Sequence, residues 1–484
     1  MIEPQTETVA ENSVPENRCG VVRQTSDFLV VLALSILIFR TFAAEAYVVP
    51  TGSMAPTLLG LHKDIECPNC GVRFALGMDE QGRSGRPVCA NCGQDDFKSA
   101  PSVECNGDRL LVQKFLFDFR APRRWEVAVF QSPNEPTQAY VKRVVALPGE
   151  SVQIVDGDIV VNGQVAHKTL AEQRAMRIPV YDHNHRPKDS DRYPRWMFRL
   201  GGGKRAVTQT SGWVAQESRF LHETSSELNP EQYDWLEYTH WEADRAKYGP
   251  VLDFASYNGM DLRGENHVLD LFFEAKLAPG PGLTEVTIRL LRGGDLFAVS
   301  LPVNGNGKVE VRRNGRIEPL INPGSGLAST GKPRLVEASI FDRRLTLAID
   351  GVVQFEPIDF PPSGLGPRGF ASPVGIGVKH GQLEVRDVKL FRDVYYTSSL
   401  ANTPKRPFAV DAPYKLGVDE FFVLGDNSAV SNDSRFWDES PVVRRELFLG
   451  KPFLVHLPGQ VVPLRVFGQS VYWVPDPREI RYIR

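Results

Sequence analysis

The sequence predicts a mainly β protein with two or three domains, and three observations support this. The chain has 484 residues, which is too long for one ordinary domain. It contains 41 Gly and 36 Pro, and few long amphipathic helical patterns. Short apolar or alternating runs are separated by turn signals such as Asp156-Gly157 and Asn162-Gly163, which are typical of hairpins.

The composition excludes two broad classes of protein. Hydrophobic residues make up 42% of the chain and charged residues 24%, which is typical of a globular protein and not of a disordered one. The formal net charge is −3, without the basic excess that usually accompanies nucleic-acid binding. We therefore expect no nucleic-acid partner.

The N-terminal region predicts a membrane anchor. Residues 1–20 are polar and predict a short disordered tail on the cytoplasmic side. Residues 21–46 are mostly apolar and predict a transmembrane anchor, because a spanning helix needs about 20 predominantly apolar residues. Arg40 and Glu45 lie near the end of this segment, where their long side chains can extend toward the lipid headgroups.

A candidate nucleophile follows directly after this segment. Ser53 is flanked by Gly52 and Met54, and Pro56 stops any helix from continuing. A hydroxyl held in a tight turn just outside an anchor suggests a nucleophile that works at a bilayer surface. Since a serine is a poor nucleophile on its own, the sequence must also supply a base.

A cleaved signal peptide is the alternative to a retained anchor, because residues 41–46 include small residues typical of a cleavage site. We favour the anchor because the polar leader is long and because cleavage there would leave Ser53 almost at a free end. Arg18 and Arg23 favour a cytoplasmic position for the N-terminal end. The rest of the chain would then lie outside the cytoplasm.

Two C-x-x-C-G knuckles predict a zinc-ribbon-like insert at residues 62–104. Their cysteines are Cys67, Cys70, Cys89 and Cys92. Four thiolates leave no open coordination position, so the Zn²⁺ would be structural and not catalytic. The alternative is a pair of disulfides, since cysteines outside the cytoplasm can oxidise.

A candidate base lies in the apolar run from Tyr140 to Ala146. Lys142 and Arg143 are adjacent there, so on a strand their side chains point to opposite faces. One of the two cations is therefore expected to face inward while the other stays in solvent. The competing interpretation is that both are solvated charges on an edge strand.

Residues 168–399 differ in character from the rest of the chain and predict a second insert, with a β-sandwich at about 250–395. The segments 344–351, 375–378 and 385–390 resemble those of concanavalin-A-like (laminin-G-like) sandwiches. Such modules bind sugars or serve only in packing. A glycan or protein ligand for the sandwich therefore stays open.

Four stretches, in order, resemble bacterial type I signal peptidases, which are membrane-anchored serine proteases. The stretches are Ser53-Met54-x-Pro56-Thr57-Leu58, Gly107-Asp108-x-x-Leu111-Val112-x-Lys114, Lys142-Arg143-Val144-Val145-x-Leu147-Pro148-Gly149-Glu150, and Gly425-Asp426-Asn427-Ser428 through Ser431-x-Asp433-Ser434-Arg435. The resemblance implies a signal-peptidase-type β catalytic core at 47–167 and 400–484. The ribbon and the sandwich would be insertions into its loops.

The resemblance implies a role for each matched residue. Ser53 would be the nucleophile and Lys142 the general base, with the pKa of Lys142 lowered by apolar surroundings. Ser431 would orient the lysine amine. Thr51, through its hydroxyl, and the Ser53 N–H would stabilise the oxyanion. The residues expected to support the site are Arg143, Asp433 and Arg435, of which the last two can pair.

The function implied by the resemblance is cleavage of N-terminal signal peptides from exported preproteins through an acyl-enzyme, with no catalytic cofactor. The partners would be the signal peptides of secretory preproteins and membrane lipid. The expected location is the bacterial cytoplasmic membrane, with a single span and the catalytic domain on the extracytoplasmic side. Small residues are expected just before the cut.

Three alternatives compete with this interpretation. A Ser-His-Asp hydrolase would need a histidine near the motifs, but none of the nine histidines lies in the four stretches. Self-cleaving repressor-type Ser/Lys proteases would not explain the anchor. An anchored carbohydrate-binding or adhesion protein on an inactive peptidase scaffold is the third, and intact Ser53, Lys142 and Ser431 argue against it.

Overall fold

The structure is a computed structural model. It describes residues 18–483 except 43, 99, 191, 201–210, 225–231, 243–244, 246, 261, 263, 304–306, 328–331, 362–368, 400–405, 439 and 467–468. The described elements are mostly strands, and the α-helices among them are α1 (Arg18–Phe42), α2 (Leu116–Phe119) and α3 (Leu170–Met176). The predicted mainly β class is confirmed. Of the predicted tail 1–20, residues 1–17 lie outside the described residues.

The largest sheet of the catalytic region has eight strands drawn from both ends of the chain. In spatial order they are β1 (Ala44–Val48), β5 (Arg109–Gln113), β32 (Phe448–Leu457), β6 (Val127–Gln131), β7 (Ala139–Ala146), β30 (Glu420–Leu424) and β31 (Val443–Arg444), with β35 (Arg481–Tyr482) paired to β32. The strands on either side of the second insert therefore close into one sheet.

A second sheet of four strands adjoins this one. Its order is β10 (Gln164–Val165), β9 (Asp158–Val161), β8 (Ser151–Val155) and β29 (Tyr414–Lys415). Asp156-Gly157 and Asn162-Gly163 form its two hairpin turns, and all four residues have positive φ, from 51° to 86°. This is the geometry that such pairs favour, so the predicted hairpins are confirmed.

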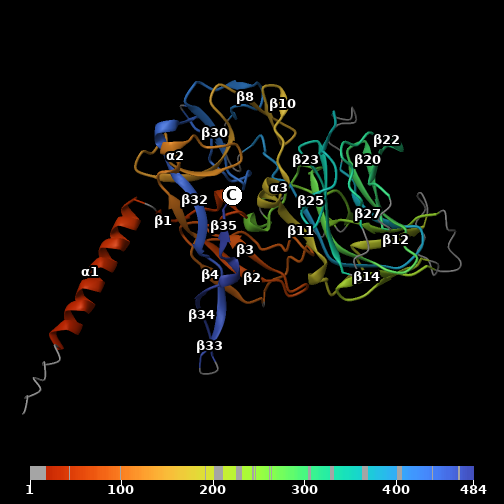
Figure 1. The fold of residues 1–484 in the computed structure, drawn as a ribbon, viewed down its shortest axis with the longest axis horizontal. Coiled ribbons are helices and arrows are strands. Elements are labelled where there is room, and N and C mark those ends of the chain that lie inside the picture. The colour runs from red at the N-terminus through yellow and green to blue at the C-terminus, as the bar shows by residue number, and fades with distance from the viewer. Residues whose placement is uncertain are drawn as a thin grey trace, which may run out of the picture.

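The second insert is a sandwich of two antiparallel sheets (Figure 1). The nine-stranded sheet contains β13 (Trp213–Ala215), β14 (Arg219–His222), β28 (Leu383–Arg392), β18 (Leu271–Pro279), β23 (Arg334–Phe341), β24 (Arg344–Ile349), β25 (Val352–Val353), β11 (Ile178–Asp182) and β26 (Ile358–Asp359). The seven-stranded sheet contains β12 (Trp196–Leu200), β15 (Asp234–Tyr238), β27 (Val374–Val378), β19 (Glu285–Arg292), β20 (Asp295–Pro302), β21 (Glu310–Arg313) and β22 (Arg316–Glu318).

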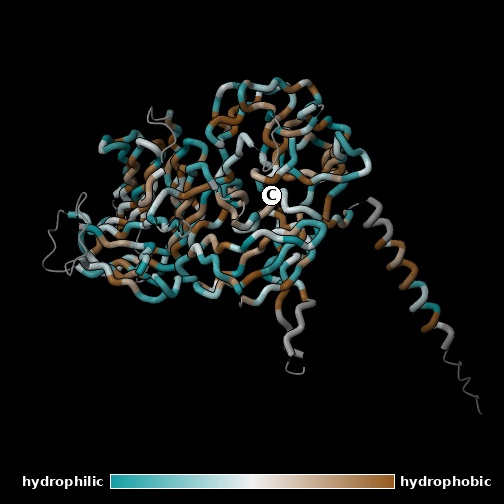
Figure 2. The backbone as a smooth tube through the Cα atoms, turned by 180° about the vertical axis from the view of Figure 1, so that it is seen from behind, coloured by the Kyte–Doolittle hydropathy of each residue, from teal (hydrophilic) through white to brown (hydrophobic). Residues whose placement is uncertain are grey.

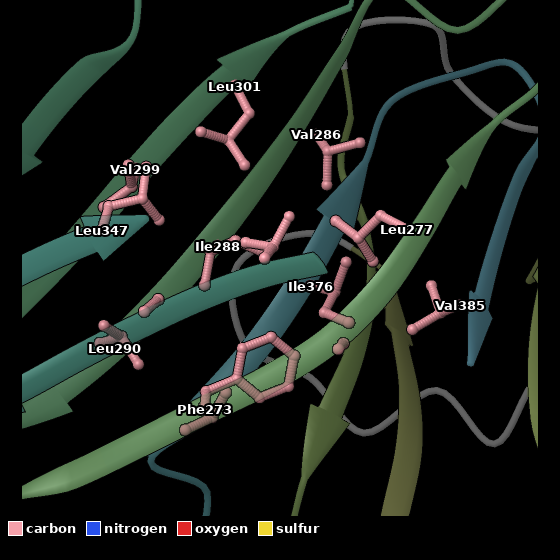
Figure 3. Close-up of a cluster of buried hydrophobic side chains, with 14 of the residues drawn as sticks. Phe273, Leu277, Val286, Ile288, Leu290, Val299, Leu301, Leu347, Ile376 and Val385 are labelled. Atoms are coloured by element: carbon pink, nitrogen blue, oxygen red, sulfur yellow. The ribbon is translucent and has the colours of Figure 1, made fainter. Parts of the chain in front are cut away.

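One apolar core fills the space between these two sheets. Figure 3 shows Phe273 of β18, Ile288 of β19 and Ile376 of β27 close together within it. The sheets begin at Ile178, so the predicted lower bound of the sandwich, about 250, is wrong. Charged residues within these strands hid them in the sequence; Arg199 of β12 and Glu237 of β15, for example, form an ion pair at 2.8 Å.

The two cysteine knuckles flank a small sheet of three strands, β3 (Arg73–Gly77), β2 (His62–Glu66) and β4 (Ser102–Cys105). The remaining elements are β16 (Trp241–Glu242), β17 (Lys247–Tyr248), β33 (Val461–Val466), β34 (Gln469–Pro475) and the 3-10 helices η1 (Gly52–Met54), η2 (His183–His185), η4 (Ser256–Asn258), η5 (Arg445–Leu447) and η6 (Pro477–Glu479).

The helix α1 projects away from the folded body in both views of the backbone (Figures 1 and 2). Its described side chains include exposed apolar ones, such as Phe28, Leu29 and Val31. Within the part of the chain that the structure describes, no helix meets the length and apolarity required to cross a membrane.

A buried ion cluster joins the sandwich to the catalytic region. Lys168 Nζ contacts Asp342 Oδ1 at 2.5 Å and Asp393 Oδ2 at 2.7 Å. The same ammonium lies 4.5 Å from the centre of the Trp125 ring. Lys168, Asp342 and Asp393 belong to the insert and Trp125 does not, so the contact of the ammonium with the Trp125 ring fixes the two parts against each other.

Candidate active site

Ser53 lies in a turn, residues 51–55, that the backbone holds at both ends; we call it the nucleophile turn. The Ala55 N–H donates to Gly52 O at 3.0 Å, and the Val49 N–H before the turn donates to Asp108 O at 2.9 Å. Met54 is fully buried in an apolar cluster with Leu58 and strand residues of the large sheet. Ser53 itself is partly buried.

Lys142 meets Ser53 from the central strand β7. Its Nζ lies 2.6 Å from Ser53 Oγ, within a hydrogen bond. Strand β7 is hydrogen-bonded on both sides, by β6 and β30, and Lys142 is only 4% exposed. The structure thus brings the predicted nucleophile and the predicted base into direct contact, although 89 residues separate them.

The surroundings of Lys142 favour its neutral form. Burial is the main cause and lowers the pKa of Lys142 from 10.5 to about 8. The Asp433 and Asp426 carboxylates raise this pKa, whereas the Arg435 guanidinium lowers it. The net result is an amine that loses its proton near pH 8 and can act as a base there.

Arg143, expected to support the site, is buried as well, so neither of the two adjacent cations stays in solvent. It is 1% exposed and donates to both carboxylate oxygens of Asp426, at 2.7 and 2.6 Å, and to Trp125 O at 2.6 Å. Residues 142–146 of strand β7 are all buried, so both faces of the strand are covered. Arg143 can be buried because the Asp426 carboxylate accepts two hydrogen bonds from its guanidinium and balances its charge.

The loop after β30 is held by a second buried pair. Arg435 Nε and Nη2 donate to Asp433 at 2.9 and 2.8 Å, and both side chains are inaccessible. Asp433 also accepts from the Gly425 N–H at 3.0 Å, while Arg435 donates to Ser428 Oγ at 2.7 Å. The predicted pairing of Asp433 with Arg435 is present.

Ser431 and Thr51 lie beside the nucleophile but make weaker contacts than expected. Thr51 is exposed, and its Oγ1 lies 3.5 Å from Ser53 Oγ. Ser431 is fully buried next to Gly425, where a Cβ would collide with both Ser431 Oγ and Ser53 O. Among the described residues Ser431 Oγ has no hydrogen-bond partner, so the expected bond to Lys142 is not made.

Four residues near the nucleophile were missed by the sequence reasoning. Asp426 and Asn427 belong to the Gly425–Ser428 motif, and their side chains could have been assigned from it. Tyr257 and Asn258 of η4 come from the sandwich insert and contact the nucleophile turn and Asn427. No sequence signal linked η4 with Ser53, because only the tertiary fold brings them together.

The four knuckle cysteines converge on one point. Their sulfurs all lie within 4.8 Å of one another, with Cys67–Cys92 at 3.5 Å and Cys70–Cys89 at 3.6 Å, and none is in a disulfide. Gly71 and Gly93 have φ of 72° and 77°, which lets each knuckle turn back on itself. Four thiols with this spacing can hold a structural metal ion.

A second group of acidic side chains lies close enough together to hold a metal ion, but ion pairs explain it. Asp158, Asp270 and Asp342 are buried close together at the junction of the catalytic region and the sandwich. Arg292 contacts Asp270 at 2.5 Å and Asp158 at 3.4 Å, and Lys168 contacts Asp342. These ion pairs account for the carboxylates without a metal ion.

Comparison with known proteins identifies relatives for part of the chain. Residues 94–220 match the family model described as signal peptidase, peptidase S26. A signal peptidase I of Leptolyngbya laminosa is 32% identical over 149 residues, covering 29% of this chain and 49% of that protein. A probable signal peptidase I-2 of Synechocystis is 27% identical over 189 residues, covering 38% and 62%. A signal peptidase I of Rickettsia bellii is 26% identical over 153 residues, covering 32% and 44%.

The chain spans about half the length of the curated relatives it matches. A solved structure of a Bacillus subtilis protein of unknown function with a galectin-like fold aligns at 12% identity. That alignment covers 45% of this chain and 98% of the other, with a TM-score of 0.27, which is too low to support a conclusion. The family model and these relatives show that part of the chain is similar to signal peptidases of family S26.

Proposed function

We propose that this protein is a membrane-anchored serine endopeptidase that removes signal peptides from exported preproteins with a Ser53–Lys142 dyad. The observation that carries the proposal is the 2.6 Å contact between Lys142 Nζ and Ser53 Oγ. The lowered pKa of Lys142 makes that contact useful for catalysis. An ordinary lysine, with a pKa of about 10.4, would be charged and could not accept a proton at neutral pH.

The first chemical step transfers the Ser53 hydroxyl proton to the neutral Lys142 amine as Ser53 Oγ attacks the scissile carbonyl. The tetrahedral intermediate collapses when the amide nitrogen leaves, taking the proton from the Lys142 ammonium. An ester then joins the signal peptide to Ser53. In the second step Lys142 accepts a proton from water, and the resulting hydroxide equivalent attacks the ester and restores Ser53.

The developing oxyanion needs hydrogen-bond donors on the side of Ser53 away from the lysine. The Ser53 backbone N–H is one donor in the proposed mechanism. Thr51 Oγ1, at 3.5 Å from Ser53 Oγ, is near enough to become the second when the carbonyl is bound. Ser431 lies within the same loop system, and a small adjustment on substrate binding would bring its hydroxyl to the Lys142 amine.

Membrane anchoring through the helical part of residues 21–46 completes the proposed function, since residues 44–46 belong to strand β1 of the large sheet and not to the predicted span. The exposed apolar side chains of α1 and its projection from the body support lipid contact (Figure 2). The proposed topology has one span in the bacterial cytoplasmic membrane and the catalytic region on the extracytoplasmic side. In that position the dyad would meet a signal peptide where it leaves the bilayer.

We also propose that the four knuckle cysteines hold one structural Zn²⁺. A tetrahedral site with Zn–S bonds of about 2.3 Å has sulfur–sulfur edges of about 3.8 Å. The distances of 3.5 and 3.6 Å between sulfur pairs are close to these edges. The ion would fix the ribbon and take no part in peptide hydrolysis.

Processing of a purified precursor tests the proposed function. The wild-type protein is expected to cut the precursor after a small residue, while Ser53→Ala and Lys142→Ala leave it intact. Both variants should remain folded, which a circular dichroism spectrum and a single thermal unfolding transition would check. Normal cleavage by either variant, or cleavage by wild type after bulky residues, would reject the proposal.

A further inference from the structure

The sandwich insert reaches the nucleophile turn through the 3-10 helix η4. Tyr257 of η4 is buried against Ala55 and Leu59, and its hydroxyl donates to Leu61 O at 3.0 Å. The ring lies so close beneath the turn that a Cβ on Gly52 would collide with it. The insert therefore forms part of the surface on which the nucleophile turn rests.

The next residue of η4, Asn258, makes a reciprocal pair of hydrogen bonds with Asn427. Asn258 Nδ2 donates to Asn427 Oδ1 at 2.8 Å, and Asn427 Nδ2 donates to Asn258 Oδ1 at 2.7 Å. The same Asn427 Nδ2 also donates to Gly52 O at 3.0 Å. The Asn427 backbone N–H donates to Ser53 O at 3.1 Å.

These bonds control the plane of the peptide between Gly52 and Ser53. In a trans peptide the C=O of one residue and the N–H of the next point in opposite directions. Fixing Gly52 O toward Asn427 therefore aims the Ser53 N–H the opposite way. Asn258 sets the orientation of the Asn427 amide. If the Asn427 amide were flipped, its NH2 group would face the NH2 group of Asn258 and its oxygen would face the oxygen of Asn258.

The far side of η4 is fixed by the cysteine ribbon. Ser256 Oγ accepts from the Ala90 N–H at 2.9 Å, one residue from Cys89, and the Met260 N–H donates to Arg86 O at 2.8 Å. The helix is thus held between the ribbon and the nucleophile turn. A rigid support of this kind can hold a hydrogen-bond donor in place before the transition state forms.

We propose that Asn258 is a positioning residue for the oxyanion donor of this enzyme, acting through Asn427 and the Gly52–Ser53 peptide. The sandwich insert, whatever else it binds, is then a required part of the active-site support. This inference rests on the proposed peptidase function of Ser53 and Lys142. It adds a residue that lies outside the family's four motif stretches.

Two substitutions of Asn258 in the full chain test the role. Asn258→Ala removes both side-chain bonds, and Asn258→Leu removes them while keeping the branched shape of the side chain. Each is expected to lower kcat about tenfold with KM unchanged, since the lost bonds act mainly in the transition state. Affinity for a peptide aldehyde, which forms a tetrahedral adduct with serine, should fall by the same factor. Affinity for the matching peptide alcohol should stay constant.

Further variants separate positioning from general loss of structure. Asn427→Ala should lower kcat at least as much, and the Asn258→Ala/Asn427→Ala double variant should lose no more than Asn427→Ala alone. Gln173→Ala is the matched control. Gln173 is another amide of the insert, fully buried, and it bonds Ser339 and the Lys168 carbonyl instead of the nucleophile turn. Its kcat should equal that of wild type.

Three results would overturn the inference. One is a kcat and aldehyde affinity within twofold of wild type for both Asn258 variants, while wild type cleaves its precursor. Another is an equal loss of kcat in Gln173→Ala, which would indicate a general effect of destabilising the insert. A wild-type protein that leaves every precursor intact would reject the proposed function itself, and the role of Asn258 with it.

Discussion

At the scale of single residues, the fold keeps Lys142, the proposed base, out of water. Burial lowers its pKa to about 8. Burial of Lys142 lowers the free energy of unfolding at neutral pH, because the folded chain binds the Lys142 proton less tightly than the unfolded chain does. The catalytic residue should therefore be a site where function opposes stability.

Lys142→Met is expected to raise the free energy of unfolding at pH 7. The difference between 10.5 and about 8 corresponds to about 3 kcal/mol at most, if Met fills the same volume. In wild type the unfolded chain binds more protons than the folded chain between pH 8 and 10.5, so this residue makes stability rise with pH across that window. Urea unfolding at pH 7 and pH 9 measures both effects.

Ser53→Ala is the control for this experiment, since it leaves the amine in place and should keep the wild-type pH dependence. An equal dependence of stability on pH in wild type and Lys142→Met would show that the Lys142 proton is not the cause.

The residues of the dyad could be predicted from the sequence, because each belongs to a motif in which chemistry restricts the residue type. Their surroundings were predicted less well. The alternating pattern leaves one of Lys142 and Arg143 in solvent, but both are buried, and the partner of Arg143, Asp426, is not identified by the pattern. An alternating pattern gives the direction of a side chain, but it does not show that both faces of β7 are covered.

At the scale of elements, the site depends on how β7, β30 and the loop after β30 are tied together. Two fully buried ion pairs do this, Arg143–Asp426 and Arg435–Asp433. A Cβ on Gly425 would collide with Ser431 and Ser53, so the loop approaches the nucleophile turn as closely as a backbone can. The loop therefore has little freedom to move away from Ser53.

Asp426→Ala is expected to lower the free energy of unfolding by about 3–5 kcal/mol, because it leaves Arg143 buried without a counter-charge. Replacing both partners, as Arg143→Met with Asp426→Leu, should recover much of this loss. Chemical denaturation followed by fluorescence measures each value.

Asp411→Ala is the matched control for a broken ion pair. Asp411 contacts Arg406 at 3.2 Å on the surface, where both side chains are well exposed. Its removal should change the free energy of unfolding by less than about 1 kcal/mol. A loss in Asp426→Ala no larger than in Asp411→Ala would contradict the role given to the buried pair.

At the scale of the whole molecule, three parts of the chain meet behind the nucleophile. The catalytic sheets, the cysteine ribbon and the sandwich come together at η4. The order of the inserts could be predicted, because each interrupts a motif series. Their meeting at Ser53 could not, because contacts between residues 258 and 427 arise from tertiary packing that no local pattern encodes.

Metal analysis of the purified protein is expected to find about one zinc per chain. Cys89→Ser should remove most of this zinc and lower the thermal unfolding temperature, since a structural metal contributes to folding. A protein with neither zinc nor free thiols would instead favour disulfides at the four cysteines. The variant Cys105→Ser is the control, because Cys105 is buried outside the cluster and should not affect the zinc content.

The pH dependence of precursor cleavage tests the central claim most directly. The wild-type kcat/KM is expected to rise about tenfold per pH unit up to about pH 8 and then level off, as Lys142 loses its proton. Lys142→Ala should show no cleavage at any pH. A wild-type rate that stays constant from about pH 6 to 9, or cleavage by Lys142→Ala at the wild-type rate, would contradict the account.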